Sequence, residues 1–250
     1  MPLVTAAGRP AGCCDVLAIL PQQAPVTRPA VCSNSANSPA VRSSMPRTQD
    51  TPADADTLIE AARAMAGSLA GDADHERTVA RLAVALFDAT RELHCLDEEH
   101  RRLLEAGALL HDTGWELGGK GHHRSSERLV LDSDLPFADD RERAFAAAVA
   151  RYHRKALPDP SHDAFSRLEA EDRDALRWCA ALVRIADGLD RGHDAVVREL
   201  SAETDHARLT ITARCSGDPE LALWGAERKT DLLEAVSGLA VHILAEKIAP

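Results

Sequence analysis

The residues of this sequence that are best suited to chemistry are histidines and aspartates next to apolar segments. His111 and Asp112 are adjacent and follow Ala108-Leu109-Leu110 at the predicted end of a helix, where both side chains can turn toward one cation. His75 lies on the apolar stripe of an earlier helix, and Asp187 ends a long apolar segment. Because a buried carboxylate needs a cation or hydrogen-bond donors, these four residues predict a metal site in the interior.

Two imidazoles and two carboxylates are ligands that several divalent ions accept, among them Mn²⁺, Fe²⁺, Co²⁺, Ni²⁺, Zn²⁺ and Mg²⁺. The sequence therefore predicts a divalent metal as the cofactor. It leaves open which ion is bound, and whether the protein holds one ion or two. Two neutral histidines with carboxylates leave positions open on such an ion for water and for a phosphate oxygen.

Phosphate chemistry also needs cations that neutralise the non-bridging oxygens. In a chain with a formal net charge of −11, basic residues close to the predicted site are informative. The candidates for phosphate binding are Lys120, Arg154, Lys155 and Arg191. The candidate catalytic residues are Asp112, which holds the ion, and Asp190 and His193, either of which can serve as an acid or a base.

Helices must position these residues. An apolar period of 3.6 residues begins at Asp54 and predicts helices over 54–70, from 72–74 onward, and over 97–111, 123–131, 139–153 and 169–187. After Asp194 the segment 208–213 alternates with a period of two, which predicts a strand. We expect its partner strand at 219–223, a helix over 226–237, and a strand or a helix end at 239–244. The predicted fold class is mainly α, a helical bundle followed by a small α+β appendage.

Three segments follow from these patterns. Residues 1–52 are rich in Pro, Ser, Ala and Asn and have no period, which predicts a disordered extension. Met45 is an alternative start of the protein. Residues 53–194 are predicted to form the helical domain, and residues 195–250 the α+β segment.

The composition argues against several classes of protein. Hydrophobic residues make up 45% of the 250 and aromatic residues only 3%, which favours packed helices over a β-sandwich. The negative net charge argues against binding to duplex nucleic acid, and the short, charge-interrupted apolar runs argue against a membrane span. The six cysteines include no CxxC pair, which favours a reduced, cytoplasmic protein without a thiolate zinc site. A homodimer is possible, and the sequence does not decide this point.

The order His75, His111-Asp112, Asp187 on successive helices resembles the HD superfamily of metal-dependent phosphohydrolases. Three stretches resemble the C-terminal HD module of the Ppx/GppA exopolyphosphatase and guanosine pentaphosphatase family, namely HDTGWELGGKGHHRSSERLVLDSDLP, ARYHRKALP and RIADGLDRGH. The later LALWGAERKTDLLEAVSG resembles the α/β segment that follows this module. The resemblance covers the chain from about Asp54 to its C-terminus. It implies an HD-type helical bundle with its four metal ligands at the positions given above.

The resemblance also implies a second metal position, bridged by Asp112 and completed by His153 and one of two neighbouring histidines. Helix geometry favours His122, because positions 122, 126 and 129 share a face. The family pattern favours His123, which leads into Arg-Ser-Ser. We choose His123.

The implied function is that of a divalent-metal-dependent phosphohydrolase, which cleaves a phosphate ester or anhydride with metal-activated water. A nucleotide, (p)ppGpp or a polyphosphate are the candidate substrates. In the full-length family the polyphosphate-cleaving site is understood to lie in N-terminal actin-like domains, which have no counterpart in this sequence. The alternative is therefore a non-catalytic module that binds polyphosphate or a nucleotide, or that partners a separate phosphatase subunit.

Overall fold

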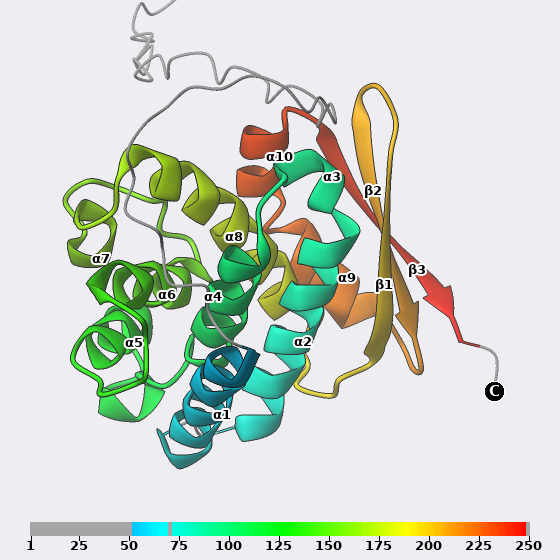
Figure 1. Ribbon diagram of the computed structural model, residues 1–250. Helices are drawn as coiled ribbons and strands as arrows, with labels where there is room; N and C mark the ends of the chain where they lie inside the picture. Colours follow the sequence, from blue (N-terminus) through cyan, green and yellow to red (C-terminus); the bar gives the residue numbers. More distant parts are fainter. Residues whose placement is uncertain (1–51, 70–71, 249–250) are drawn as a thin grey trace, which may run out of the picture.

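The computed structural model describes residues 52–69 and 72–248. Residues 1–51 of the predicted extension, including Met45, lie outside the described residues. A helical bundle occupies most of the described chain, and a small sheet stands beside it (Figure 1). The prediction of a mainly helical fold with a small α+β appendage is confirmed.

The bundle contains six longer helices, three of which carry residues of the predicted metal site. In chain order its elements are α1 (Pro52–Leu69), α2 (Ala73–Ala89), α3 (Arg91–His94), α4 (Glu98–Leu109), η1 (Trp115–Leu117), α5 (His122–Leu131), α6 (Asp140–Tyr152), α7 (Asp163–Ser166) and α8 (Ala170–Leu189). The predicted helices are present with ends shifted by a few residues, and the short elements α3, η1 and α7 were not predicted.

The apolar stripe predicted for α2 is buried, since His75, Val79, Leu82 and Leu86 are at most 3% exposed. The helix begins after Asp72, whose side chain accepts hydrogen bonds from the backbone N–H groups of Asp74 and His75. An aspartate at this position satisfies N–H groups that have no partner within the helix. The cap therefore fixes the first turn of α2, and with it the position of His75.

The core consists largely of alanine and leucine. In α6, the run 144–150 is wholly buried, and five of its seven residues are alanine. In α8, nearly every residue from Ala175 to Leu189 is buried. Alanine side chains allow helix axes to approach closely, so the inner helices bring their side chains within reach of one another without large aromatic residues between them.

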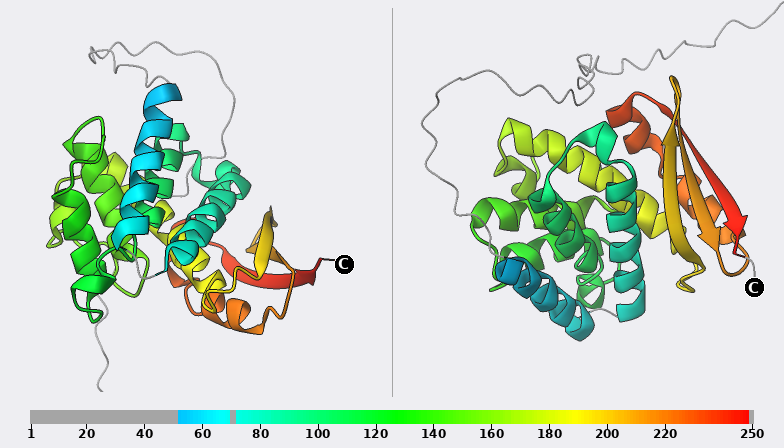
Figure 2. Two further views of the ribbon diagram at one scale, coloured as in Figure 1. Left: turned by 90° about the horizontal axis from the view of Figure 1, so that it is seen from below. Right: turned by 45° about the vertical axis from the view of Figure 1, so that its right-hand side comes forward.

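The sheet has three strands in the order β1 (Val197–Thr204), β2 (Arg208–Cys215) and β3 (Ala240–Lys247). Strands β1 and β2 are antiparallel, whereas β2 and β3 are parallel. The connection from β2 to β3 consists of α9 (Glu220–Glu227) and α10 (Asp231–Ser237). Helix α9 contacts both α8 and β3, and the sheet lies at one side of the bundle (Figure 2).

Two predictions for this part are wrong. The segment 219–223 is not a strand, because Pro219 caps α9 and residues 220–223 form its first turn. The true antiparallel partner of β2 is β1, whose largely exposed side chains give no apolar alternation. The predicted helix over 226–237 is interrupted at 228–230, between α9 and α10. Of segment 239–244, for which both a strand and a helix end were considered, residues 240–244 lie in β3.

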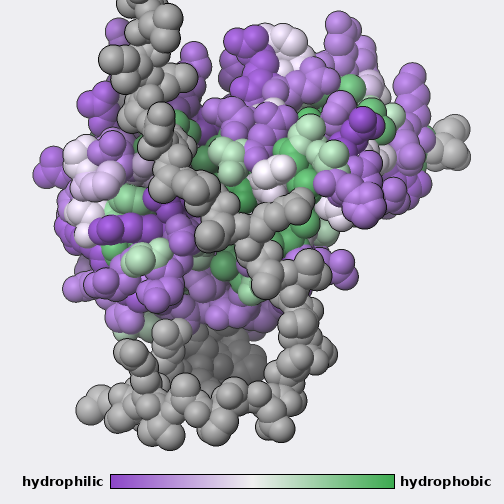
Figure 3. Space-filling model, turned by 90° about the horizontal axis from the view of Figure 1, so that it is seen from above, coloured by the Kyte–Doolittle hydropathy of each residue, from purple (hydrophilic) through white to green (hydrophobic). Residues whose placement is uncertain are grey.

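The exterior is mostly polar. The face in Figure 3 is largely hydrophilic, with hydrophobic residues gathered near its centre. None of the described helices has the length and apolar character that crossing a bilayer requires. Cys179 and Cys215 are free and buried.

Candidate metal centre

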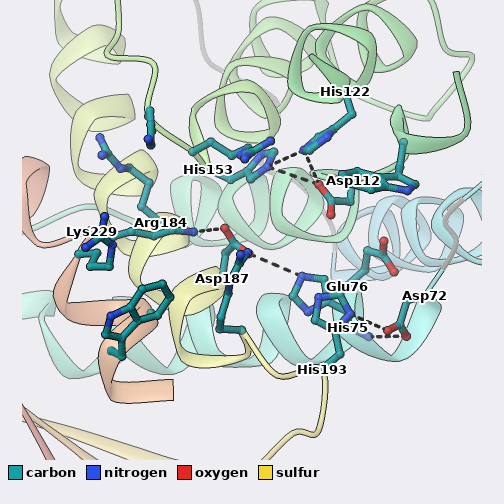
Figure 4. Close-up of a pocket in the computed structure, with 17 residues that line it drawn as sticks. Asp72, His75, Glu76, Asp112, His122, His153, Arg184, Asp187, His193 and Lys229 are labelled. Carbon is teal, nitrogen blue, oxygen red and sulfur yellow. Dashed lines mark hydrogen bonds and ion pairs between the residues drawn. The ribbon is translucent and has the colours of Figure 1, made fainter. Parts of the chain in front are cut away.

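A pocket of about 610 Å³ lies among the helices of the bundle, beside the contact between α8 and α9. Its walls come from α2, the turn after α4, α5, α6, α8 and the segment around the end of α9 (Figure 4). Histidines, carboxylates and basic side chains line it together. The predicted metal ligands His75, Asp112 and Asp187 are among these residues.

The first potential ligand group consists of His75, His111 and Asp112. One ligand atom from each lies within 4.8 Å of the others, although the residues come from α2 and from the turn after α4. His111 is fully buried. Oδ1 of Asp187, at the C-terminal end of α8, lies 3.6 Å from Nε2 of His75. The three stretches that the sequence analysis combined therefore meet at one place.

The second group consists of Asp112, His122 and His153. Oδ1 of Asp112 lies 3.1 Å from Nε2 of His122 and 3.4 Å from Nε2 of His153. The two Nε2 atoms are 3.3 Å apart. Asp112 is common to both groups, so its carboxylate lies between two sets of imidazoles (Figure 4).

His122, and not His123, belongs to this second group. His122 begins α5, and that end of the helix packs directly on Gly114. A Cβ atom at position 114 would lie 2.5 Å from the carbonyl oxygen of His122 and 2.4 Å from the backbone nitrogen of Ser126. This close approach brings His122 to Asp112, and the helical rotation turns the next side chain away from the pocket. The helix-geometry argument thus gives the arrangement that the structure shows, and the family-pattern argument for His123 does not.

All four histidines of the two groups have Nδ1 next to an oxygen acceptor. Nδ1 lies 2.7 Å from the Ala108 carbonyl oxygen for His111, 2.7 Å from that of Ala150 for His153, and 2.8 Å from that of Gly119 for His122. For His75 the acceptor is a carboxylate oxygen of Asp190, at 2.8 Å. A histidine whose Nδ1–H is held by an oxygen presents the lone pair of Nε2, which is the usual arrangement of a metal-ligating imidazole.

At the centre, the buried Nε2 of His111 has no hydrogen-bond partner within the described part of the chain. Oδ1 of Asp112 is also buried, and the nearest potential donor is Nε2 of His122, 3.1 Å away. Leaving a buried acceptor unsatisfied costs about 1–3 kcal/mol. Nitrogen lone pairs that converge on a carboxylate oxygen also repel it. A divalent cation accepts all of these lone pairs at once, so the residues present fit a metal.

One comparison with known proteins identifies the chain's family. The family model described as Ppx/GppA phosphatase, domain III, matches residues 60–225. The chain belongs to this family. The matched range contains every residue of both ligand groups, Asp187, and most of α9. The sequence resemblance to the Ppx/GppA family is therefore confirmed for domain III.

Electrostatics keep three candidate ligands of this Ppx/GppA domain in the forms that bind metals. Burial lowers the pKa of His111, and it lowers the pKa of His153 to about 3, so both imidazoles are neutral near pH 7. Burial opposes ionisation of Asp112, but the positive charges that His111 and His153 carry in the acidic range, together with the close contact with His122, outweigh it and hold the pKa of its carboxyl well below the usual range. These two histidines and Asp112 therefore need no change of protonation to bind a cation.

His75 differs from the other histidines. Burial opposes its protonation, yet its contacts with the carboxylates of Asp187 and Asp190 raise its pKa to about 10. Without a metal, the imidazole of His75 is therefore protonated and positively charged at neutral pH, and it lies between these two carboxylates. A divalent ion bound at this position would replace the proton.

The two candidate acid or base residues lie around His75. Asp190 is buried, and its Oδ1 also accepts a hydrogen bond from the Ala195 backbone N–H. The ring of His193 stacks on that of His75 with centroids 3.9 Å apart, and its Nδ1 lies 2.8 Å from Oδ2 of Asp72. His193 has a φ of +54°, a left-handed conformation that non-glycine residues rarely adopt. His193 lines the pocket, whereas Asp190 lies behind His75.

The basic candidates divide into two sets. Arg154, Lys155 and Arg191 line the pocket. Lys120, by contrast, is exposed in the glycine-rich turn and does not line it.

Several pocket residues were missed by the sequence analysis. Lys229 forms an ion pair with Oδ2 of Asp187, and Arg184 and Arg228 also line the pocket. Glu76 is buried, its Oε2 has no hydrogen-bond partner among described residues, and burial raises its pKa to about 7. One signal was available, since Arg184 interrupts the otherwise apolar run 180–186.

Proposed function

We propose that this protein is a divalent-metal-dependent phosphohydrolase that cleaves a phosphate ester or anhydride. The observation that carries the proposal is the set of four imidazoles whose Nδ1 atoms are held by oxygen acceptors and whose Nε2 atoms surround Asp112. The donor set consists of nitrogen and carboxylate oxygen, which suits Mn²⁺, Fe²⁺, Co²⁺, Ni²⁺, Zn²⁺ or Mg²⁺.

Two ions fit the arrangement of ligands. His75, His111, Asp112 and Asp187 would hold one ion, and Asp112, His122 and His153 would hold the other. When bound, such ions lower the pKa of a water molecule and polarise a phosphoryl group. Asp112 would contribute to both positions, so it is the residue on which the whole centre depends.

Other residues of the pocket act on the substrate and on protons. Arg154, Lys155 and Arg191 supply positive charge at the pocket wall, where they can neutralise the non-bridging oxygens of a phosphoryl group. Glu76 can hold or accept a proton near pH 7 because its pKa is raised to about 7. Asp190 holds Nδ1 of His75 and so acts as a positioning residue. His193 stacks on the outer face of His75 and remains a candidate acid or base.

The candidate substrates are a nucleotide, (p)ppGpp and a polyphosphate, and the proposed site of action is cytoplasmic. The size of the pocket, about 610 Å³, is within the range of small-molecule sites. We do not propose a duplex nucleic acid or a membrane as a partner. A homodimer is compatible with this proposal.

The proposal is tested by metal analysis and a phosphate-release screen. The purified protein is loaded separately with each candidate ion and assayed on nucleotides, (p)ppGpp, short polyphosphates and simple phosphate esters. We expect release of phosphate from at least one compound, and loss of both bound metal and activity in Asp112→Ala. Asp132→Asn, an exposed carboxylate paired with Arg128, is the matched control and should keep both.

The second candidate is a binding module, and the family match favours it because the match is to domain III of the phosphatases. Such a module would bind a polyphosphate or a nucleotide, or it would partner a separate phosphatase subunit. Bound metal and polyphosphate binding without phosphate release from any compound would favour the module and contradict the hydrolase. Full activity in Asp112→Ala would contradict the metal-centred mechanism.

A further inference from the structure

Arg184 is a buried cation that the structure leaves incompletely paired. It lies on α8 and is 3% exposed. Its Nη2 donates to both carboxylate oxygens of Asp231, at 2.9 Å and 3.2 Å. Its Nε and Nη1 are buried and have no hydrogen-bond partner within the described ranges. Since a guanidinium stays protonated in proteins and unpaired buried donors are costly, these two N–H groups call for an anionic partner.

The position of Arg184 places it beside the proposed metal centre. It lies three residues before Asp187, and side chains three apart on a helix share a face. Both line the same pocket. In Figure 4, Asp187 lies between Arg184 and Lys229 on one side and Asp112 and His122 on the other. An anion at Arg184 would therefore be next to, but not within, the two ligand groups.

Two more cations reach this side of the pocket from the end of α9. The approach is close because α8 and α9 cross at Gly188 and Gly225, where a Cβ at position 225 would lie 2.3 Å from the Gly188 carbonyl oxygen. Arg228 and Lys229 follow immediately and line the pocket. The guanidinium of Arg228 lies 5.0 Å from the ring centroid of Trp224, which is half exposed. This stacking orients Arg228 without using its N–H groups.

We propose that Arg184, Arg228 and Lys229 form an anion subsite next to the metal centre, which binds a second phosphate of the ligand. The inference deepens the proposed function and rests on it for one point, that a first phosphoryl group lies at the metal. The ligand class is then a compound with two neighbouring phosphates, such as a diphosphate. The subsite itself does not depend on hydrolysis.

A purely structural role for Arg184 does not explain why its Nε and Nη1 are buried without a partner among the described residues. Its contact with Asp231 ties α8 to α10, but the Asp231 side chain is 61% exposed, so solvent weakens the pair. That pair also uses only one of the three guanidinium nitrogens. A tie between two helices does not require the remaining donors to be buried at a pocket wall.

The experiment measures binding of pyrophosphate and of inorganic phosphate to chelator-treated protein by calorimetry at low ionic strength. We expect Arg184→Met to weaken pyrophosphate binding at least tenfold. Asp231→Asn, which removes the carboxylate that competes for the guanidinium, should strengthen binding severalfold. Arg177→Gln, at a partly exposed position of the same helix where Arg177 pairs with Asp174, is the control and should bind as the wild type does.

Opposite results overturn the subsite. Equal binding by Arg184→Met and the wild type would refute it, and weaker binding by Asp231→Asn would show that the pair acts only in folding. If Arg184→Met does not fold, Arg228→Gln, at an exposed residue, takes its place. We expect this variant to bind pyrophosphate about threefold to tenfold more weakly than the wild type. Failure of the proposed hydrolysis would leave these binding results unchanged, so the two hypotheses fail separately.

Discussion

Three single substitutions distinguish how many ions the centre holds and which residues hold them. Asp112→Asn removes a negative charge from both ligand groups, so we expect it to lose both ions. His122→Ala removes a ligand only from the group with His153, so it should keep one ion. His123→Ala changes the neighbouring histidine, which lies outside both groups, so this variant should keep two ions.

The size of the effect follows from linkage between binding and folding. An ion present at 100 times its dissociation constant stabilises the native state by about 2.7 kcal/mol. For a chain of this size, each kcal/mol shifts Tm by about 2–4 °C. Two independently bound ions should therefore raise the Tm of the wild type by about 10–20 °C. His122→Ala should show about half of that shift, and Asp112→Asn almost none.

The assay combines metal content after gel filtration with thermal unfolding, with and without metal. The metal-free proteins are compared first, because a variant that is already destabilised would give a misleading shift. Two results would refute the reasoning. One is a full metal complement in Asp112→Asn. The other is loss of an ion in His123→Ala together with its retention in His122→Ala, which would mean that the position of α5 in solution differs from the structure.

Three further predictions concern single side chains. Metal binding at pH 7–8 should release about one proton, because the pKa of His75 is raised to about 10 without metal. Calorimetry in buffers of different ionisation enthalpy measures this release, and no release would show that His75 is already neutral. Burial raises the pKa of Glu76 from 4.5 to about 7, so its ionisation destabilises the metal-free fold as pH rises from about 4.5, and the penalty is complete above about 7. Glu76→Gln should match the wild type near pH 4.5 and exceed it by roughly 3 kcal/mol at pH 8, and equal denaturation midpoints at both pH values would contradict this. Lys229→Met should tighten metal binding about fivefold to thirtyfold, the equivalent of 1–2 kcal/mol for the lost ion pair with Asp187, and unchanged affinity would show that the pair does not compete with the metal.

The sequence allowed the first ligand group to be predicted because each residue had a local signal. His75 follows a helix cap and lies on an apolar stripe, and Asp187 ends an apolar segment. Whether His122 or His123 lies beside Asp112 depended on helix rotation, and the periodic argument indicated His122, the histidine that the structure places there. Local periodicity is reliable where the buried face of a helix is set by packing.

Arg184, Arg228 and Lys229 could not be assigned from the sequence for a different reason. Their position depends on the contact between Gly188 and Gly225, which joins helices 37 positions apart in numbering. No local pattern reports a crossing of this kind. The strand β1 was missed for a related reason, since its side chains are mostly exposed and its pairing with β2 is decided by backbone hydrogen bonds.

The pocket combines two features that oppose each other electrostatically when it is considered alone. A site that binds only anions gains nothing from the carboxylates of Asp112 and Asp187, which repel phosphate. A site that binds only metal gains nothing from cations such as Arg184 and Lys229. The carboxylates and the basic side chains together stabilise a bound ligand that carries charges of both signs, namely a divalent metal ion with a phosphate anion. In the metal-free protein the opposite charges partly satisfy one another, as the pair of Lys229 with Asp187 shows. Because a metal at Asp187 makes that pairing unnecessary, Lys229 becomes available to the anion, and the charges of the pocket are used most fully when metal and phosphate are bound together.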